Sequence, residues 1–175
     1  MDGKTLLEGT LEKNFDFKRL ATPDRGDEAT SACPLENSWS LKATLSEKKT
    51  RLSIYLIYDD PRDGYRIACK ITFHFEPNGQ SLVRPGYAAK GYFDLTTSDR
   101  VTRELLALIN EKLLSRGISF PQPEHVTNPD LRNNVESNWG KDAPPDLNYV
   151  EIAKAFVESC IEWIRAGGLK KKGLS

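Results

Sequence analysis

The clearest structural signal in the sequence is the alternating stretch YRIACKITFHF at residues 65–75. Every second side chain from Ile67 to Phe75 is apolar. A period of two places these side chains on one side of a β-strand, because successive strand residues point to opposite faces. The stretch therefore predicts a strand with Ile67 and Phe75 turned toward the core and Arg66, Lys70 and polar neighbours turned away from it.

Alternation on either side of this stretch predicts an antiparallel sheet of about four strands. Residues 39–47 and 51–58 alternate in the same way, and a weaker run covers 88–95. The segment DDPRDG at 59–64 is rich in turn formers, so it predicts a hairpin that joins 51–58 to 65–75. These strands define one half of the expected fold.

Two amphipathic runs supply the other half. One extends over 98–116, follows the helix-starting residues Thr97, Ser98 and Asp99, and stops at Gly117. The second covers 146–166 and has apolar side chains at helical spacing. We expect an α+β fold in which both helices back one face of the sheet, because their apolar stripes must be buried somewhere.

The remaining segments are less regular. Residues 20–38 and 118–148 read as irregular loops, and the second contains five prolines. Residues 4–18 suggest a peripheral helix or strand, and 168–175 a flexible tail. A chain of 175 residues is of a size for one domain with one core, so we expect 1–175 to form a single domain.

Composition predicts a cytoplasmic protein without a membrane segment. No stretch approaches the roughly 20 consecutive apolar residues of a membrane-spanning helix, and the N-terminus lacks the apolar region of a secretory signal. Cys33, Cys69 and Cys160 are odd in number and far apart, which argues against a disulfide framework. We expect Cys69 and Cys160 to be small core residues.

The charges balance globally but not locally. The chain has 25 basic and 25 acidic residues, so nothing commits it to nucleic acid. Residues 39–95 carry nine basic and six acidic groups, whereas 118–148 carry two and five. The predicted sheet is therefore mildly basic, and the long loop is acidic.

The sequence lacks the motifs of common enzyme and cofactor sites. It has no phosphate-binding P-loop, no dinucleotide-binding glycine motif, no zinc-protease motif and no nucleophile elbow. With only His74 and His125, a multi-histidine metal site is excluded. We therefore predict no cofactor and no metal, and favour a non-enzymatic role.

One acidic cluster could in principle hold a hard cation. Asp59, Asp60 and Asp63 offer oxygen ligands but lack the alternation and terminal glutamate of a calcium loop. Aspartate, proline and glycine are also the residues that a hairpin turn needs. The turn is the preferred interpretation.

The sheet face opposite the apolar one is the main candidate for binding. Its expected members are Lys42, Thr44, Tyr55, Arg66, Lys70, Thr72, His74, Lys90 and Tyr92. Cations and tyrosines could meet a protein partner, or attract phosphates and stack on bases. The face could also be merely solvated, or be neutralised by an acidic loop such as 118–148 that folds across it.

The long loop adds further candidates. His125, Asn133, Asn134, Glu136 and Trp139 are recognition residues if the loop is exposed, although Trp139 could equally fix the loop to the domain. Trp163 lies beside the apolar stripe of the last helix, where core packing is the better interpretation. The run Lys170–Lys172 is typical of a solvated tail.

These patterns favour an intracellular binding or regulatory domain that recognises a protein partner through the open sheet face and the 118–148 loop. The candidate partner-binding residues are Lys42, Tyr55, Arg66, Lys70, His74, Lys90, Tyr92, His125 and Trp139. One alternative is a nucleic-acid-binding module that uses the same face. Another is an enzyme with a dispersed active site that uses His74 or His125 as acid or base.

Overall fold

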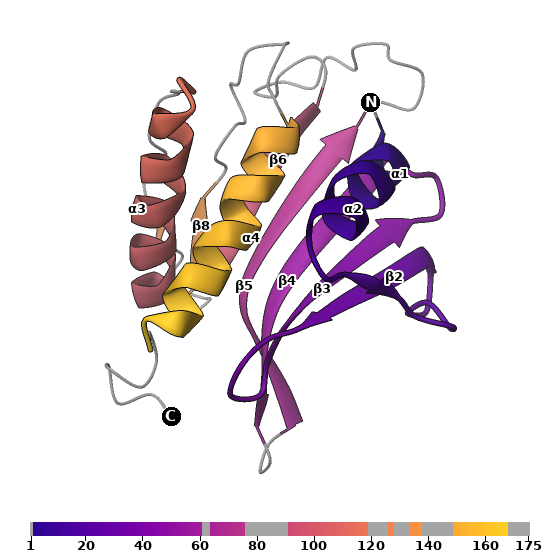
Figure 1. The fold of residues 1–175 in the computed structure, drawn as a ribbon, viewed down its shortest axis with the longest axis horizontal. Coiled ribbons are helices and arrows are strands. Elements are labelled where there is room, and N and C mark those ends of the chain that lie inside the picture. Colours follow the sequence, from indigo (N-terminus) through magenta and orange to yellow (C-terminus); the bar gives the residue numbers. More distant parts are fainter. Residues whose placement is uncertain are drawn as a thin grey trace.

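An antiparallel sheet backed by helices makes up the computed structural model, which describes residues 2–60, 64–75, 91–118, 126–127, 134–137 and 149–167 (Figure 1). The described strands pair in the order β1-β2-β3-β4-β5-β6-β8-β7. Their bounds are β1 (Lys18–Arg19), β2 (Asp27–Pro34), β3 (Trp39–Ser46), β4 (Arg51–Asp60), β5 (Gly64–Phe75), β6 (Gly91–Ser98), β7 (Val126–Thr127) and β8 (Asn134–Ser137).

Helices lie against one face of this sheet. An N-terminal helical segment consists of α1 (Gly3–Leu6), the π-helical turn η1 (Leu7–Leu11) and α2 (Glu12–Asn14). The two long helices are α3 (Asp99–Ser115) and α4 (Tyr149–Arg165). In Figure 1, α4 and the N-terminal segment lie side by side over the strands, and α3 packs along the far side of α4.

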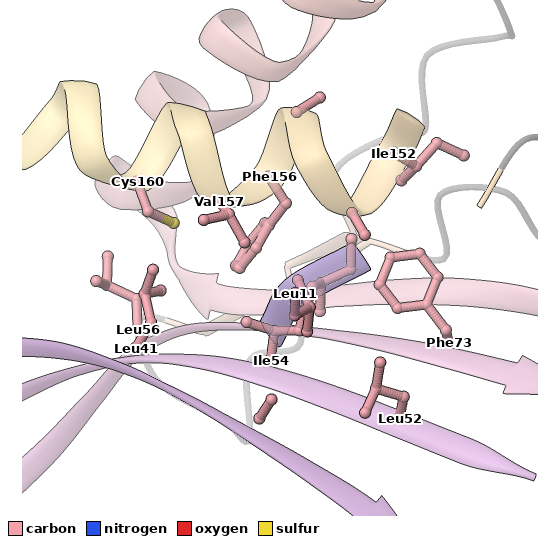
Figure 2. Close-up of a cluster of buried hydrophobic side chains, with 14 of the residues drawn as sticks. Leu11, Leu41, Leu52, Ile54, Leu56, Phe73, Ile152, Phe156, Val157 and Cys160 are labelled. Atoms are coloured by element: carbon pink, nitrogen blue, oxygen red, sulfur yellow. The ribbon is translucent and has the colours of Figure 1, made fainter. Parts of the chain in front are cut away.

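The helices and the sheet share one apolar core. Figure 2 shows Phe156 and Val157 of α4 above the strands, with Leu11 of the N-terminal segment beside Ile54 and with Phe73 nearby. All five side chains are fully buried. Burying a side chain of this size contributes about 1.5–3 kcal/mol to folding, so these layers depend on each other for stability.

The α+β class predicted from the sequence is confirmed. Strands β3, β4 and β5 match the predicted runs, and β4 pairs with β5 as an antiparallel hairpin on either side of residues 61–63. Strand β6 starts and ends three residues later than the predicted run over 88–95. Both long helices begin and end within three residues of the expected positions.

Two parts of the sequence prediction were wrong. Residues 20–38 were expected to be irregular but contain β2, which pairs with β3 along its length. The N-terminal segment was expected to be peripheral, yet Leu6, Leu7 and Leu11 are completely buried. The expected loop at 118–148 contributes the short strands β7 and β8, and most of its other residues lie outside the described part, as does 168–175.

A β-bulge changes which side chains of β5 face the helices. Leu56 pairs with Cys69, but the next residue of β4, Ile57, pairs with Ile67, so Ala68 is an extra residue on β5. A one-residue shift in the pairing reverses the faces that the β5 side chains occupy beyond the bulge, from Ile67 toward the hairpin turn. The inward position predicted for Ile67 is therefore wrong, and its side chain is 53% exposed.

None of the helices in the described ranges is long and apolar enough to cross a membrane.

Candidate partner-binding surface

The sheet face opposite the helices, called the outer face below, carries polar side chains in rows that cross the strands. One row runs from Lys42 on β3 through Tyr55 on β4 to Lys70 on β5. The neighbouring row consists of the hydroxyl residues Thr30, Thr44, Ser53 and Thr72. Residues paired directly across antiparallel strands have Cβ atoms about 5 Å apart, so each row forms a continuous strip of side chains.

The hydroxyl row is buried, and three of its four members form side-chain hydrogen bonds. The Ser53 Oγ and Thr72 Oγ1 atoms lie 3.0 Å apart and share a hydrogen bond. At the other end of the row, Thr30 Oγ1 accepts a hydrogen bond of 2.8 Å from the Asp24 N–H. These four side chains are shorter than those of the neighbouring row of Lys42, Tyr55 and Lys70, which extend further from the sheet.

Lys70 and Tyr55 interact across the central strands. The Lys70 Nζ atom lies 6.0 Å from the centroid of the Tyr55 ring, which is the outer limit for a cation–π contact. Both side chains are half-buried. Lys70 forms no ion pair with the side chains that the structure describes.

The segment at residues 20–26 places an acidic side chain over this face. Asp24, from residues 20–26, places its carboxylate 2.7 Å from Lys42 Nζ. Gly26 turns the chain with a φ of 85°, a backbone conformation that glycine adopts without strain. Lys42 is therefore neutralised locally, and the part of the face near β2 is not basic.

A hollow of about 160 Å³ opens where this segment meets the sheet. It is lined by Asp24, Asp27, Lys42, Thr44, Tyr55, Ile57 and Ile67. Burial, followed by the neighbouring Asp24 charge, raises the pKa of the Asp27 carboxyl above its ordinary value, although Arg51 and Lys42 oppose the change. The hollow thus combines an apolar wall, a carboxylate held in an unfavourable environment and a tyrosine ring.

The structure brings together only some of the predicted binding residues. Lys42, Tyr55, Lys70 and His74 share the outer face, and His74 pairs with Arg51 on one side and with the backbone of Tyr92 on the other. Arg66 pairs with Tyr58 in the register of β4 and β5. Lys90, His125 and Trp139 lie outside the described residues.

Sequence reasoning missed the residues that shape the hollow. Ile57 had a usable signal, because it is an apolar residue at a position that the alternation of 51–58 assigns to the outer face. Ile67 had none, since no residue type marks the bulge at Ala68. Asp24 and Asp27 were missed because residues 20–38 were interpreted as an irregular loop.

A second cavity lies on the helix side of the sheet. This groove of about 400 Å³ runs between the end of the N-terminal segment, the end of β2 and the end of α4. Its lining residues are Lys13, Asn14, Phe15, Asp16, Cys33, Pro34, Leu35, Glu36, Ile161, Ile164 and Arg165. Arg165 and Glu36 pair across its rim at 3.5 Å, and both are largely exposed.

Trp163 occupies a core position, as the sequence indicates. Its ring packs edge-on against Trp39 at 5.8 Å, and its indole N–H donates a hydrogen bond of 2.5 Å to the Glu104 carboxylate on α3. Within the described ranges, no three His, Cys, Asp or Glu side chains lie together as a metal site would require. Asp59 and Asp60 lie at the hairpin end of β4, whereas Asp63 lies outside the description.

The fold and surface together define an α+β protein with an antiparallel sheet and a mixed-charge outer face. Comparisons with protein-family models, curated proteins and solved structures yield no match to this chain. Its function has to be argued from the geometry of the surface itself.

Proposed function

We propose that this chain is an intracellular, non-enzymatic binding domain that recognises a protein partner through the outer face of its sheet. The main support is Ile67, which is 53% exposed beside Tyr55 and the buried Ile57. A large apolar side chain next to a tyrosine, within a polar surround, is the composition of a protein interface.

The charge pattern favours a protein over a nucleic acid. Binding to a nucleic-acid backbone requires several cations that are not already paired, because each contact between a cation and a phosphate releases a counterion from the nucleic acid. On the outer face, Lys42 pairs with Asp24, and Asp27 adds a further negative charge beside it. A surface that is acidic near β2 and cationic at Lys70 suits a partner that carries both signs of charge.

A pull-down from the native cells tests this proposal. The double variant Tyr55→Ala with Lys70→Glu removes the ring and reverses the charge at the centre of the outer face. We expect the variant to recover at least about tenfold less partner than the wild-type chain, because truncating an aromatic anchor costs about 2 kcal/mol or more of binding free energy. Quantitative mass spectrometry of the captured proteins provides the measurement.

A matched variant on the helix side serves as the control. Leu114→Ala with Lys4→Glu also combines loss of an apolar side chain with a charge reversal, and both residues are exposed. This control should keep wild-type recovery. Equal recovery by the two double variants would remove the outer face from the proposal.

A nucleic-acid partner would give a different result. Binding to single- or double-stranded probes at low salt, with an affinity that falls steeply toward physiological salt, would favour the phosphate-binding alternative. We expect no shift of such probes in a mobility assay.

A further inference from the structure

The hollow between Asp24, Asp27 and Ile67 has the size of one side chain. Sites for small-molecule ligands usually enclose about 300–1,000 Å³, whereas this hollow has a volume of about 160 Å³. It is therefore too small for a drug-sized compound. A single long side chain that projects from a partner is a better match for its volume.

Charge identifies the kind of side chain. The charged groups that line the hollow are two aspartates and one lysine, which leaves one negative charge in excess. Asp24 pairs with Lys42, whereas Asp27 forms no ion pair with any described residue. Burial already raises the pKa of the Asp27 carboxyl, so this carboxylate would be stabilised by a cation placed beside it.

Three other lining residues, Thr44, Ile57 and Ile67, add to the case for a ligand. Thr44 lines the hollow and is only 8% exposed, so its hydroxyl offers a hydrogen-bonding group there. A hydroxyl oxygen can accept a hydrogen bond from a cationic donor. Ile57 and Ile67 pair across β4 and β5 and form an apolar wall against which an aliphatic stem could pack.

We propose that this hollow binds a basic side chain, arginine or lysine, presented by the protein partner. The aliphatic stem packs on Ile57 and Ile67, and the cationic head donates hydrogen bonds to Asp27 and Thr44. Tyr55 borders the head with its ring, where a cation is attracted to the aromatic face. This inference rests on the proposed function, because it names the chemistry of the partner at the same surface.

A titration followed by NMR on the ¹⁵N-labelled protein tests the inference directly. The probes are N-acetyl-arginine methylamide, the lysine equivalent, and N-acetyl-citrulline methylamide, which is similar in shape to the arginine probe but uncharged. We expect both basic probes to shift the amide signals of Asp27, Thr44 and Ile67, and citrulline to bind about tenfold more weakly. Equal binding of citrulline and arginine, or shifts confined to other residues, would overturn the inference.

Variants show whether Asp27 supplies the charge. Asp27→Asn should weaken binding of the arginine probe by about tenfold. Glu28→Gln is the matched control, since Glu28 is the next residue of β2, is exposed and faces Lys49 at 3.7 Å. It should leave binding unchanged, and a loss equal to that of Asp27→Asn would indicate unspecific attraction and reject the site.

A second variant tests the apolar wall without touching a charge. Ile67→Ala replaces an exposed side chain, so the fold should tolerate it. We expect weaker binding of all three probes with the preference for arginine over citrulline retained. Unchanged binding would exclude Ile67 as the surface for the stem.

The two proposals fail in distinguishable ways. If the Tyr55→Ala and Lys70→Glu variant loses the partner but the basic probes do not bind, the outer face is an interface and the hollow is not a basic-residue site. If the basic probes bind but partner recovery is unaffected, the proposed function fails and the hollow alone remains.

Discussion

Gly3 marks the closest approach of the N-terminal helix to the sheet. A Cβ atom added at this position would lie 2.6 Å from Leu45 Cδ1 and 3.1 Å from the carbonyl oxygen of Lys49. The Gly3 N–H donates a hydrogen bond of 3.0 Å to that same oxygen. Because Gly3 has no side chain, the first turn of the helix can lie in direct contact with Leu45 of β3.

We expect Gly3→Ala to lower the free energy of unfolding by about 1 kcal/mol, because the cost of overpacking exceeds the gain in helix propensity. Gly9→Ala is the matched control in the same helical segment, since nothing lies within 4 Å of its added Cβ. That change should raise stability by about 0.5–1 kcal/mol. Urea unfolding measures both, and equal stabilisation by the two substitutions would disprove the close approach at Gly3.

The three cysteines should be unreactive in the folded protein. Cys33, Cys69 and Cys160 are buried and form no disulfide. Burial raises the pKa of the Cys33 thiol and raises that of Cys160 strongly, with smaller contributions from Asp16 and Cys69 respectively. Because the thiolate is the reactive form, we expect no labelling by Ellman's reagent under native conditions and three labelled thiols in denaturant. Rapid labelling of native protein would contradict the buried positions.

At the scale of elements, the N-terminal segment is fixed to the sheet by Glu12. Its carboxylate accepts hydrogen bonds of 2.9 and 2.7 Å from the Arg19 guanidinium and one of 2.5 Å from the Ser31 hydroxyl on β2. These hydrogen bonds, with that from Arg19 the largest, hold the pKa of Glu12 below its ordinary value despite the opposing effect of burial. The ionised form is therefore the one that the fold stabilises.

Glu12 should contribute stability that depends on pH. A carboxyl with a depressed pKa in the folded state stabilises the protein above its unfolded pKa and loses that contribution as the pH falls through the folded value. We expect Glu12→Gln to cost about 1 kcal/mol at pH 7, and little at a pH well below the ordinary pKa of glutamate. Glu8→Gln is the control, because Glu8 contacts Arg19 only at 3.5 Å on the exposed side. A cost independent of pH would rule out the ionised carboxylate as its source.

The elements that could be predicted from the sequence are those with large apolar side chains at regular spacing. Strand β5 and helix α4 are of this kind, with Phe73 and Phe156 as central members. Strand β2 was missed because its helix-side residues, Ala29, Ser31 and Cys33, are too small to give a hydrophobic period. The N-terminal helix offered only three leucines, although Asp2 caps it by accepting a hydrogen bond of 2.9 Å from the Thr5 N–H.

The candidate surface was predictable only in part, for a physical reason. Alternation along β3, β4 and β5 places Lys42, Tyr55 and Lys70 on one face, because strand geometry alone decides that. The hollow beside them depends on the bulge at Ala68 and on a turn that carries Asp24 back to Lys42, eighteen residues further along the chain. Neither a bulge nor a contact between distant residues has a period that a single sequence reveals.

At the scale of the molecule, one buried cluster includes side chains from the N-terminal segment, from strands β2 to β5 and from both long helices. Leu6 and Leu11 come from the N-terminal segment, Ile71 from β5, Leu105 from α3 and Phe156 from α4. Ion pairs add to the contact between the long helices: Lys112 meets Glu162 at 2.6 Å, and Arg116 meets Glu158 at 2.7 Å. Surface pairs of this kind are worth at most about 1 kcal/mol each, so the shared core is the main coupling between the layers.

The chain should therefore unfold in one cooperative transition, and Phe156→Ala should weaken all layers together. We expect a loss of about 3–5 kcal/mol, because the substitution leaves a cavity where α4, the sheet and the N-terminal segment meet. Two probes of urea unfolding should give the same midpoint. One is helix content, measured by circular dichroism, and the other is tryptophan fluorescence, to which the buried Trp39 and Trp163 contribute. Leu114→Ala, at a side chain that is 63% exposed, should change stability by less than about 0.5 kcal/mol. Separate midpoints for the two probes would mean that α3 and α4 form a unit that can unfold without the sheet.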